Sequence, residues 1–187
     1  MIGWSGNDYD QDWSRVVQDD SYRYLKLDIT RETGGFEGGK MVINEITFYE
    51  GILGQRAYPT PDNYMENPRY PAPQVVTCSS FATQEEHCFR AFDGIDTANS
   101  TWITKPVGSR NHVLSKPQYV LIDIGKGRGI LPTALKIVCD SGHPANPKGC
   151  PMTFVLSGSN DNIRFKTLFK QDSYAYNNEF ANGCAVN

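Results

Sequence analysis

Alternation of apolar and polar residues predicts a protein built from β-strands. Residues 24–29 alternate strictly, with Leu25, Leu27 and Ile29 separated by polar or aromatic side chains. This period of two is typical of a strand with one buried face. A second run, residues 41–49, is rich in β-branched and aromatic residues. Glycines between the two runs predict that they pair as a long-looped hairpin.

Three later runs have the same character, at residues 119–124, 134–138 and 152–156, and Gly, Pro, Asn and Asp separate them. Short strands with such turn residues between them predict an all-β protein, an antiparallel sandwich or barrel. One short helix is expected in addition. Thr83 and Glu86 have capping-box spacing, Phe89 and Phe92 follow on one face, and Gly94 would end about two turns.

Charge and hydropathy limit the classes of partner. The 187 residues carry a formal net charge of −3, which gives no general attraction to nucleic acid or to an anionic membrane. No apolar run approaches the roughly 18 residues of a membrane-spanning helix. The first residues lack the basic start and apolar stretch of a secretory signal. We therefore expect an intracellular protein or an internal piece of a longer chain.

An internal repeat and a proline-rich stretch divide the chain. A shift of 152 residues places Ser5–Gly6 on Ser157–Gly158 and Asp20–Ser21–Tyr22 on Asp172–Ser173–Tyr174. Residues 51–73 contain five prolines and read as an ordered or semi-extended connector. The sequence thus predicts an N-terminal hairpin in residues 1–50, a connector in 51–73 and a main sandwich in 74–187.

Four motifs together resemble one known family. They are Phe92–Asp93–Gly94 with Thr101–Trp102 after it, residues 119–125, residues 151–161, and the pair formed by residues 22–30 and 44–49. In this spacing they resemble the discoidin family, also called coagulation factor 5/8 type C, which includes many carbohydrate-binding modules. The resemblance implies an antiparallel jelly-roll sandwich of the galactose-binding-like fold.

The order of the motifs departs from that family. The strands at residues 22–30 and 44–49 resemble the family's last two strands, yet here they come first. The chain is then either a fragment of a tandem array or a permuted domain whose residues 22–50 complete its own sandwich. We favour the permuted domain, because domain termini often lie close together and a fragment would leave unpaired edges.

The resemblance implies a structural calcium ion near the Asp–Gly motif. Carried over to this sequence, its ligands would be Asp93, Asp96, Thr101, Glu45 and the carbonyl of Arg90. Calcium prefers six to eight oxygen ligands, and these residue types supply them. The alternative is a plain turn, with Asp and Gly present for their backbone geometry. A Glu45 side chain that reaches the Asp93 turn within one chain would support the permuted domain.

The cysteines bear on the compartment. Cys78 with Cys88, and Cys139 with Cys150, each bracket a short loop and predict two local disulfides, with Cys184 left over. Disulfides, and a glycosylation sequon at Asn99, favour an extracellular or cell-surface location over a cytoplasmic or ciliary one. The alternatives are free buried thiols and a zinc site, for which Cys139, His143 and Cys150 lack a fourth ligand.

Ligand binding is expected at loops on one end of the sandwich, where the resemblance places it. The side chains suited to sugar recognition there are Arg110, Asn111, His112, His143 and Phe36. Guanidinium and amide groups donate to adjacent hydroxyls, and an aromatic face packs on the apolar side of a sugar ring. An ordinary solvated loop is the alternative for each of them. The three tryptophans are expected in the core.

Catalysis is not indicated. There is no Gly-x-Ser-x-Gly elbow and no His-Glu-x-x-His pair, and the glycine-rich segment 125–129 lacks the ending of a phosphate-binding loop. We therefore expect a non-catalytic module that binds glycans or other cell-surface ligands through its end loops. The alternative is a structural subunit of a larger ciliary or cell-surface assembly, held by neighbouring subunits through the tyrosine-rich connector.

Overall fold

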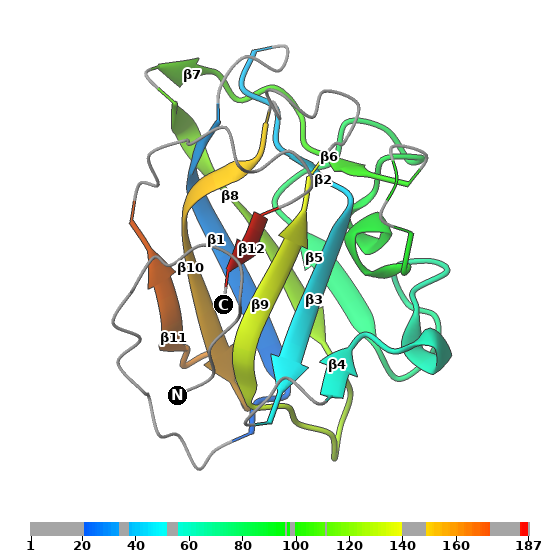
Figure 1. Cartoon of the computed structure of the whole chain (residues 1–187). Helices are drawn as coiled ribbons and strands as arrows, with labels where there is room; N and C mark the ends of the chain where they lie inside the picture. The colour runs from blue at the N-terminus through cyan, green and yellow to red at the C-terminus, as the bar shows by residue number, and fades with distance from the viewer. Residues whose placement is uncertain are drawn as a thin grey trace, which may run out of the picture.

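A computed structural model describes residues 21–33, 38–51, 56–95, 97, 100–110, 112–139, 149–172 and 184–186. Two antiparallel sheets face each other in this part of the chain (Figure 1), which confirms the expected all-β sandwich. The jelly-roll connectivity stays a prediction. The strands are β1 (Tyr24–Glu32), β2 (Val42–Ile43), β3 (Glu45–Glu50), β4 (Arg56–Tyr58), β5 (Val75–Cys78), β6 (Trp102–Ile103), β7 (Ser109–Arg110), β8 (Val113–Asp123), β9 (Pro132–Val138), β10 (Pro151–Ser159), β11 (Lys166–Gln171) and β12 (Cys184–Val186).

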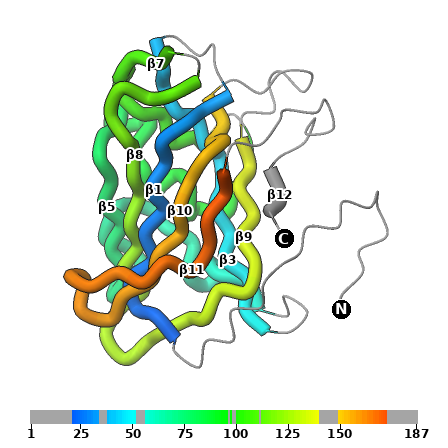
Figure 2. The backbone as a smooth tube through the Cα atoms, turned by 90° about the vertical axis from the view of Figure 1, so that its left-hand side faces the viewer, coloured from blue at the N-terminus to red at the C-terminus, as the bar shows by residue number. Residues whose placement is uncertain are grey.

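The larger sheet has the order β11-β10-β1-β8-β5, with β7 paired to β8 (Figure 2). Strand β1 lies near its middle, and Leu27 is opposite Leu156 of β10 on one side and Val120 of β8 on the other. Alternate residues of β1 are buried, as its sequence pattern predicts. An early segment of the chain therefore lies between two strands, β8 and β10, that come much later in the sequence.

The smaller sheet has the order β12-β9-β3-β4, and β2 pairs with β6 beside it. The run at residues 41–49 is divided at Asn44 into β2 and β3. The expected hairpin between the two N-terminal runs does not form, because β1 and β3 lie in different sheets. The apolar side chains of both strands instead enter one core cluster from opposite sheets. When β1 and β3 lie in opposite sheets, each can bury its apolar face against the other sheet.

The core lies between the two sheets and is closed at one side by loops. Trp102 is fully buried, as expected for a large aromatic in such a sandwich, whereas Trp4 and Trp13 lie outside the described residues. The largest fully buried side chains are Trp102, Phe92, Phe154, Leu25, Leu27, Ile29, Met41, Ile43, Ile46, Met65, Ile122 and Ile124. Burial of apolar surface on this scale is the main source of stability for the fold.

The expected α-helix is a shorter 3₁₀-helix, η2 (Cys88–Phe92). His87 is its N-cap, and Thr83 and Glu86 form a separate turn in which the Thr83 hydroxyl donates to the Glu86 carboxylate at 2.9 Å. The nearby Cys78–Cys88 disulfide ties the start of η2 to β5. The capping-box spacing therefore marks a turn here and not the start of a helix. Gly94, with φ of 76°, follows Asp93 after the end of η2.

The connector is packed against the sandwich and contains structure of its own. Strand β4 pairs with the end of β3, and a 3₁₀ turn, η1 (Pro61–Asn63), follows it. Met65 is 1% exposed, and its amide donates to the carbonyl of Phe92 at 2.9 Å. Residues beyond β4 therefore cover the η2 side of the core.

Candidate functional site

Three loop segments meet at one end of the sandwich, the end at which β7 lies in Figure 1. The Gly108 amide donates to the Gly38 carbonyl at 2.8 Å, and the Thr33 amide donates to the Cys150 carbonyl at 2.9 Å. A third bond, at 3.0 Å, joins the Glu32 amide to the carbonyl of His112. These bonds bring together the flanks of all the segments that the sequence predicts to hold ligand-binding residues. We call this the loop end.

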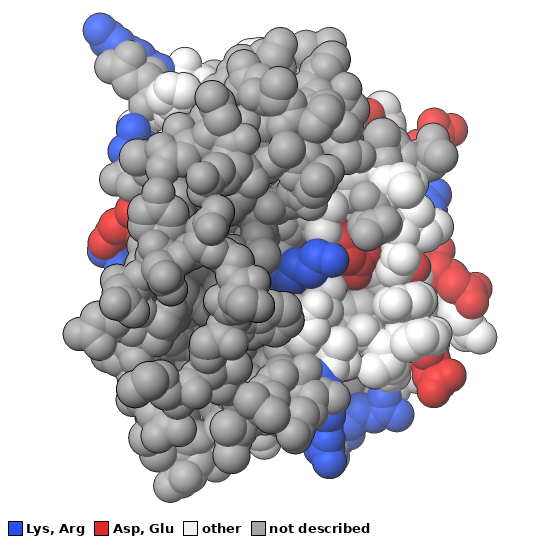
Figure 3. All heavy atoms as spheres, in the orientation of Figure 1, with Lys and Arg blue, Asp and Glu red and all other residues white. Residues whose placement is uncertain are grey.

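Two of the predicted ligand residues can be placed at the loop end. Arg110 closes β7 opposite Val113 of β8, and both Arg110 and His112 are exposed. His112 has φ of 67°, which is uncommon for a residue other than glycine. Asn111, His143 and Phe36 lie outside the described residues. The turn between β7 and β8 thus presents an arginine and a histidine to solvent, and Lys and Arg atoms project at the corresponding corner of Figure 3.

Two glycines hold the β7 hairpin against the loop before β2. A Cβ at Gly39, where φ is 79°, would lie 2.7 Å from the carbonyl carbon of Gly108. Only a residue without a side chain permits this approach of the two backbones. The Thr104 hydroxyl also accepts the Met41 amide at 2.9 Å, and the Thr104 amide donates back to the Met41 carbonyl at 3.1 Å. Close backbone approach and the Thr104 hydroxyl therefore fix this part of the loop end.

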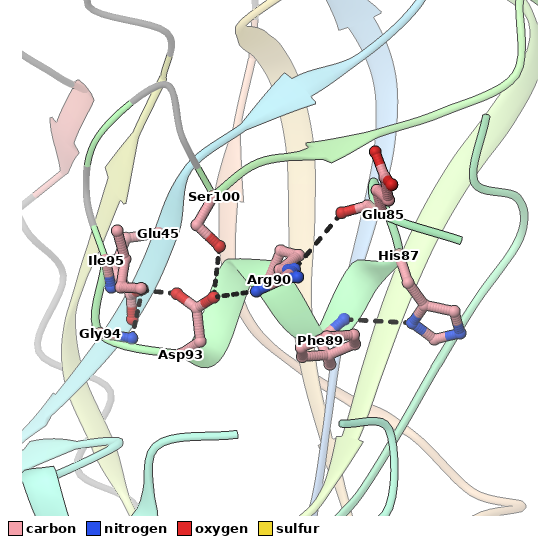
Figure 4. A network of polar contacts seen from close by, with 9 residues as sticks. All are labelled: Glu45, Glu85, His87, Phe89, Arg90, Asp93, Gly94, Ile95 and Ser100. Carbon is pink, nitrogen blue, oxygen red and sulfur yellow. Dashed lines mark hydrogen bonds and ion pairs between the residues drawn. The ribbon is translucent and has the colours of Figure 1, made fainter. Parts of the chain in front are cut away.

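The Asp93 turn follows η2 and contains a network of polar contacts (Figure 4). The Asp93 carboxylate accepts a hydrogen bond from the Ile95 amide at 3.0 Å and another from the Ser100 hydroxyl. Arg90 Nη1 lies 3.5 Å from Asp93 Oδ2, and the Asp93 side chain is 6% exposed. Burial raises the pKa of the Asp93 carboxyl above its ordinary value, and these hydrogen bonds offset part of that rise.

Glu45 reaches the same turn from the start of β3. Its Oε2 accepts a hydrogen bond from the Gly94 amide at 3.0 Å, and Glu45 is 6% exposed. Glu45 and Asp93, two members of the predicted calcium set from distant parts of the chain, thus lie at the same turn (Figure 4). Thr101 is 8% exposed, and the Arg90 side chain contacts Asp93 and the Glu85 carbonyl. Asp96 lies outside the described residues.

The described carboxylates at this turn are engaged by protein donors. Among the residues that the structure places, no group of three or more His, Cys, Asp or Glu side chains could hold a metal ion. Asn44 is 0% exposed, and neither its side-chain nitrogen nor its side-chain oxygen has a hydrogen-bond partner among the residues that the structure describes. A buried carboxamide without partners is costly and therefore notable. Sequence reasoning missed Asn44, since its position within a strand-like run gave no signal of a special role.

Both predicted disulfides are confirmed. The Cα atoms of Cys78 and Cys88 are 6.2 Å apart and those of Cys139 and Cys150 are 5.7 Å apart. This pairing favours two disulfides over the free-thiol alternative for the four cysteines and over a zinc site at Cys139 and Cys150. Cys184 lies on β12, opposite Ile137.

Evidence on the compartment comes from these bonds. Disulfides persist in oxidising environments, so two of them favour an extracellular location. Asn99, the predicted glycosylation site, lies outside the described residues. In the part of the chain that the structure covers, no helix has the length and apolar character needed to cross a membrane.

Comparison of the chain with protein-family models, with curated proteins and with solved structures found no match.

Proposed function

We propose that this chain is a non-catalytic, discoidin-type binding module that recognises glycans or another cell-surface ligand at the loop end. The observation that carries the proposal is the convergence of the loop flanks. Hydrogen bonds from Gly108 to Gly38, from Thr33 to Cys150 and from Glu32 to His112 bring the three segments to one place. A site built from several loops on a rigid sandwich is a common arrangement for binding proteins.

The exposed side chains suit recognition of hydroxyl groups. Arg110 offers a planar set of donors that can contact adjacent hydroxyls, and the His112 ring offers a donor and an acceptor. The backbone around them is fixed by the β7 and β8 pairing at Arg110 and Val113. A preformed loop loses less conformational entropy on binding than a flexible one does.

The proposal includes a structural calcium ion at the Asp93 turn. Two carboxylates from distant parts of the chain, Glu45 and Asp93, are buried there. Carboxylate oxygens are ligands that calcium prefers. Calcium would raise the unfolding midpoint of the protein, and Glu45→Gln would reduce that increase. An unfolding midpoint that is the same in calcium and in chelator would argue against the ion.

Glycan binding by the whole chain tests the main proposal. A glycan array would be probed with the wild type, with Arg110→Ala and with His112→Gly, which keeps the left-handed backbone available. Lys126→Ala is the matched control, because Lys126 is exposed and follows the opposite end of β8. We expect both loop-end variants to lose binding and the control to retain it. Absence of any glycan binding by the wild type would contradict the proposal.

A second candidate is a structural role through the connector. Tyr70 is 50% exposed on this segment, although Met65 nearby is buried. An exposed aromatic on an anchored segment suits a protein interface. Hydroxyl-radical footprinting of the protein within its native assembly distinguishes glycan binding from the structural role. Protection of Tyr70 together with the loop end, and no sugar affinity, would favour the structural role.

A further inference from the structure

The loop end carries a concentration of positive charge in a protein that is negative overall. The formal net charge of the chain is −3, yet no Asp or Glu occurs between Asp96 and Asp123. Within that interval, residues 105–116 hold three cations, Lys105, Arg110 and Lys116. We call residues 105–116 the cationic hairpin. In the described loop-end segments flanking it, the only carboxylate is that of Glu32, which is fully buried.

The cations of this hairpin are exposed, and they lack carboxylate partners among the described residues. Lys105, Arg110 and Lys116 are all exposed and take part in none of the described ion pairs. The body of the sandwich differs. On β1, for example, Lys26 Nζ lies 2.8 Å from Asp28 Oδ1. Within the described residues of the loop end, no carboxylate is therefore paired with these cations.

The backbone that carries these charges is held in place. The Ser115 amide donates to the Gly108 carbonyl at 2.9 Å, which continues the pairing of Arg110 with Val113. The Lys105 amide donates to the Ser80 hydroxyl at 3.3 Å. In Figure 3, Lys and Arg atoms, with no Asp or Glu atoms among them, lie at the corner where Figure 1 shows β7. The hairpin thus presents several cations from a fixed scaffold.

We propose that the ligand of the loop end is an anionic glycan, bound through sulfate or carboxylate groups by the cationic hairpin. This inference rests on the proposed glycan-binding function and adds the charge of the ligand. Arginine pairs with planar carboxylate groups and with sulfate oxygens through two parallel hydrogen bonds, and lysine acts as a point charge. A neutral sugar would form no ion pair with the three exposed cations, whereas an anionic chain could pair with them.

The test compares matched glycans on the full-length chain. Calorimetry would measure binding of a heparin oligosaccharide and of a neutral dextran oligosaccharide of similar length, each at low and at high salt. The variants are Lys105→Gln, Arg110→Gln and Lys116→Gln, with Lys126→Gln as the control at the other end of β8. We expect each hairpin variant to weaken heparin binding about twofold to fivefold, because an exposed ion pair contributes that much. Salt should weaken it further.

The outcomes separate this inference from the function on which it rests. Equal affinity for the neutral and anionic oligosaccharides, or heparin binding that neither salt nor the hairpin variants reduce, would overturn the anionic ligand and leave the glycan-binding function intact. No affinity for any glycan would overturn both. Vesicles that contain phosphatidylserine would be tested in parallel. Binding to them without binding to heparin would overturn the inference in favour of a lipid surface.

Discussion

Glu45 accepts a hydrogen bond from the Gly94 amide at 3.0 Å, although the two residues are 49 positions apart in the chain. This contact joins the first strand of the smaller sheet to the turn after η2. Glu45 is 6% exposed, whereas Gly94 lies on an exposed turn. The bond therefore replaces hydration that the carboxylate lost on folding.

Removal of this carboxylate should destabilise the fold. Glu45→Ala leaves the Gly94 amide without its acceptor, and we expect the free energy of unfolding to fall by about 1–3 kcal/mol. Glu45→Gln keeps an acceptor oxygen and should cost less. Urea denaturation measures both changes, with Glu66→Ala as an exposed control. Equal stability of Glu45→Ala and the control would show that the contact does not support the fold.

Stability should fall in mild acid because of His87. Its Nδ1 accepts the Phe89 amide at 3.3 Å and caps η2, which requires a neutral ring. Burial lowers the pKa of His87 from 6.5. With a folded pKa below the unfolded one, this contribution to stability is complete above pH 6.5 and is lost as the pH falls through the folded pKa.

A variant without a titrating ring isolates this effect. His87→Asn keeps an N-capping acceptor but has no proton to gain in this range. Urea denaturation at pH 7.5 and at pH 5 should give a smaller loss of stability for the variant than for the wild type. The remaining titratable groups are the same in both proteins, so their contribution cancels when the two losses are compared. The same loss in both would show that His87 does not govern the acid response.

The positions of the strands along the chain were predictable from the sequence, but the strands that pair with each other were not. Alternation in residues 24–29 is a local property that follows from one buried face, and β1 covers that segment. Pairing depends on residues far away. The same alternation would fit a hairpin with β3 or the observed place between β10 and β8. Only the complete core decides between them.

The candidate site shows the same limit. The disulfides were predictable because each closes a short local loop, and the exposed Arg110 followed from its polar surroundings. The partnerless Asn44 carboxamide was not, because its cost depends on burial by residues from other strands. Likewise, η2 is a 3₁₀-helix capped by His87, and its tie to β5 through Cys88 joins residues that a local capping pattern does not contain.

Loss of either disulfide should have a similar effect on stability. Their loops have sequence separations of 10 and 11 residues, so the chain-entropy model gives about 2–3 kcal/mol for each. The variants are Cys78→Ala with Cys88→Ala, and Cys139→Ala with Cys150→Ala. Alanine avoids placing a hydroxyl in the core, since Cys88 and Cys150 are both 0% exposed. Unfolding in guanidinium would measure the two losses. A loss confined to one pair would contradict this expectation.

The contact between Tyr22 and Gly158 should behave as a coupled pair. Tyr22 is 5% exposed, and a Cβ on Gly158 would lie 2.5 Å from its ring. Gly158→Ala must therefore displace the ring, and we expect a loss of about 1–3 kcal/mol from overpacking. Tyr22→Ala loses buried aromatic area but makes room for the new methyl group. In the double variant the alanine at position 158 should cost less than it does alone, and urea denaturation of all four proteins gives the coupling energy. Additive losses would mean that the ring moves aside without cost and that Gly158 is present for another reason.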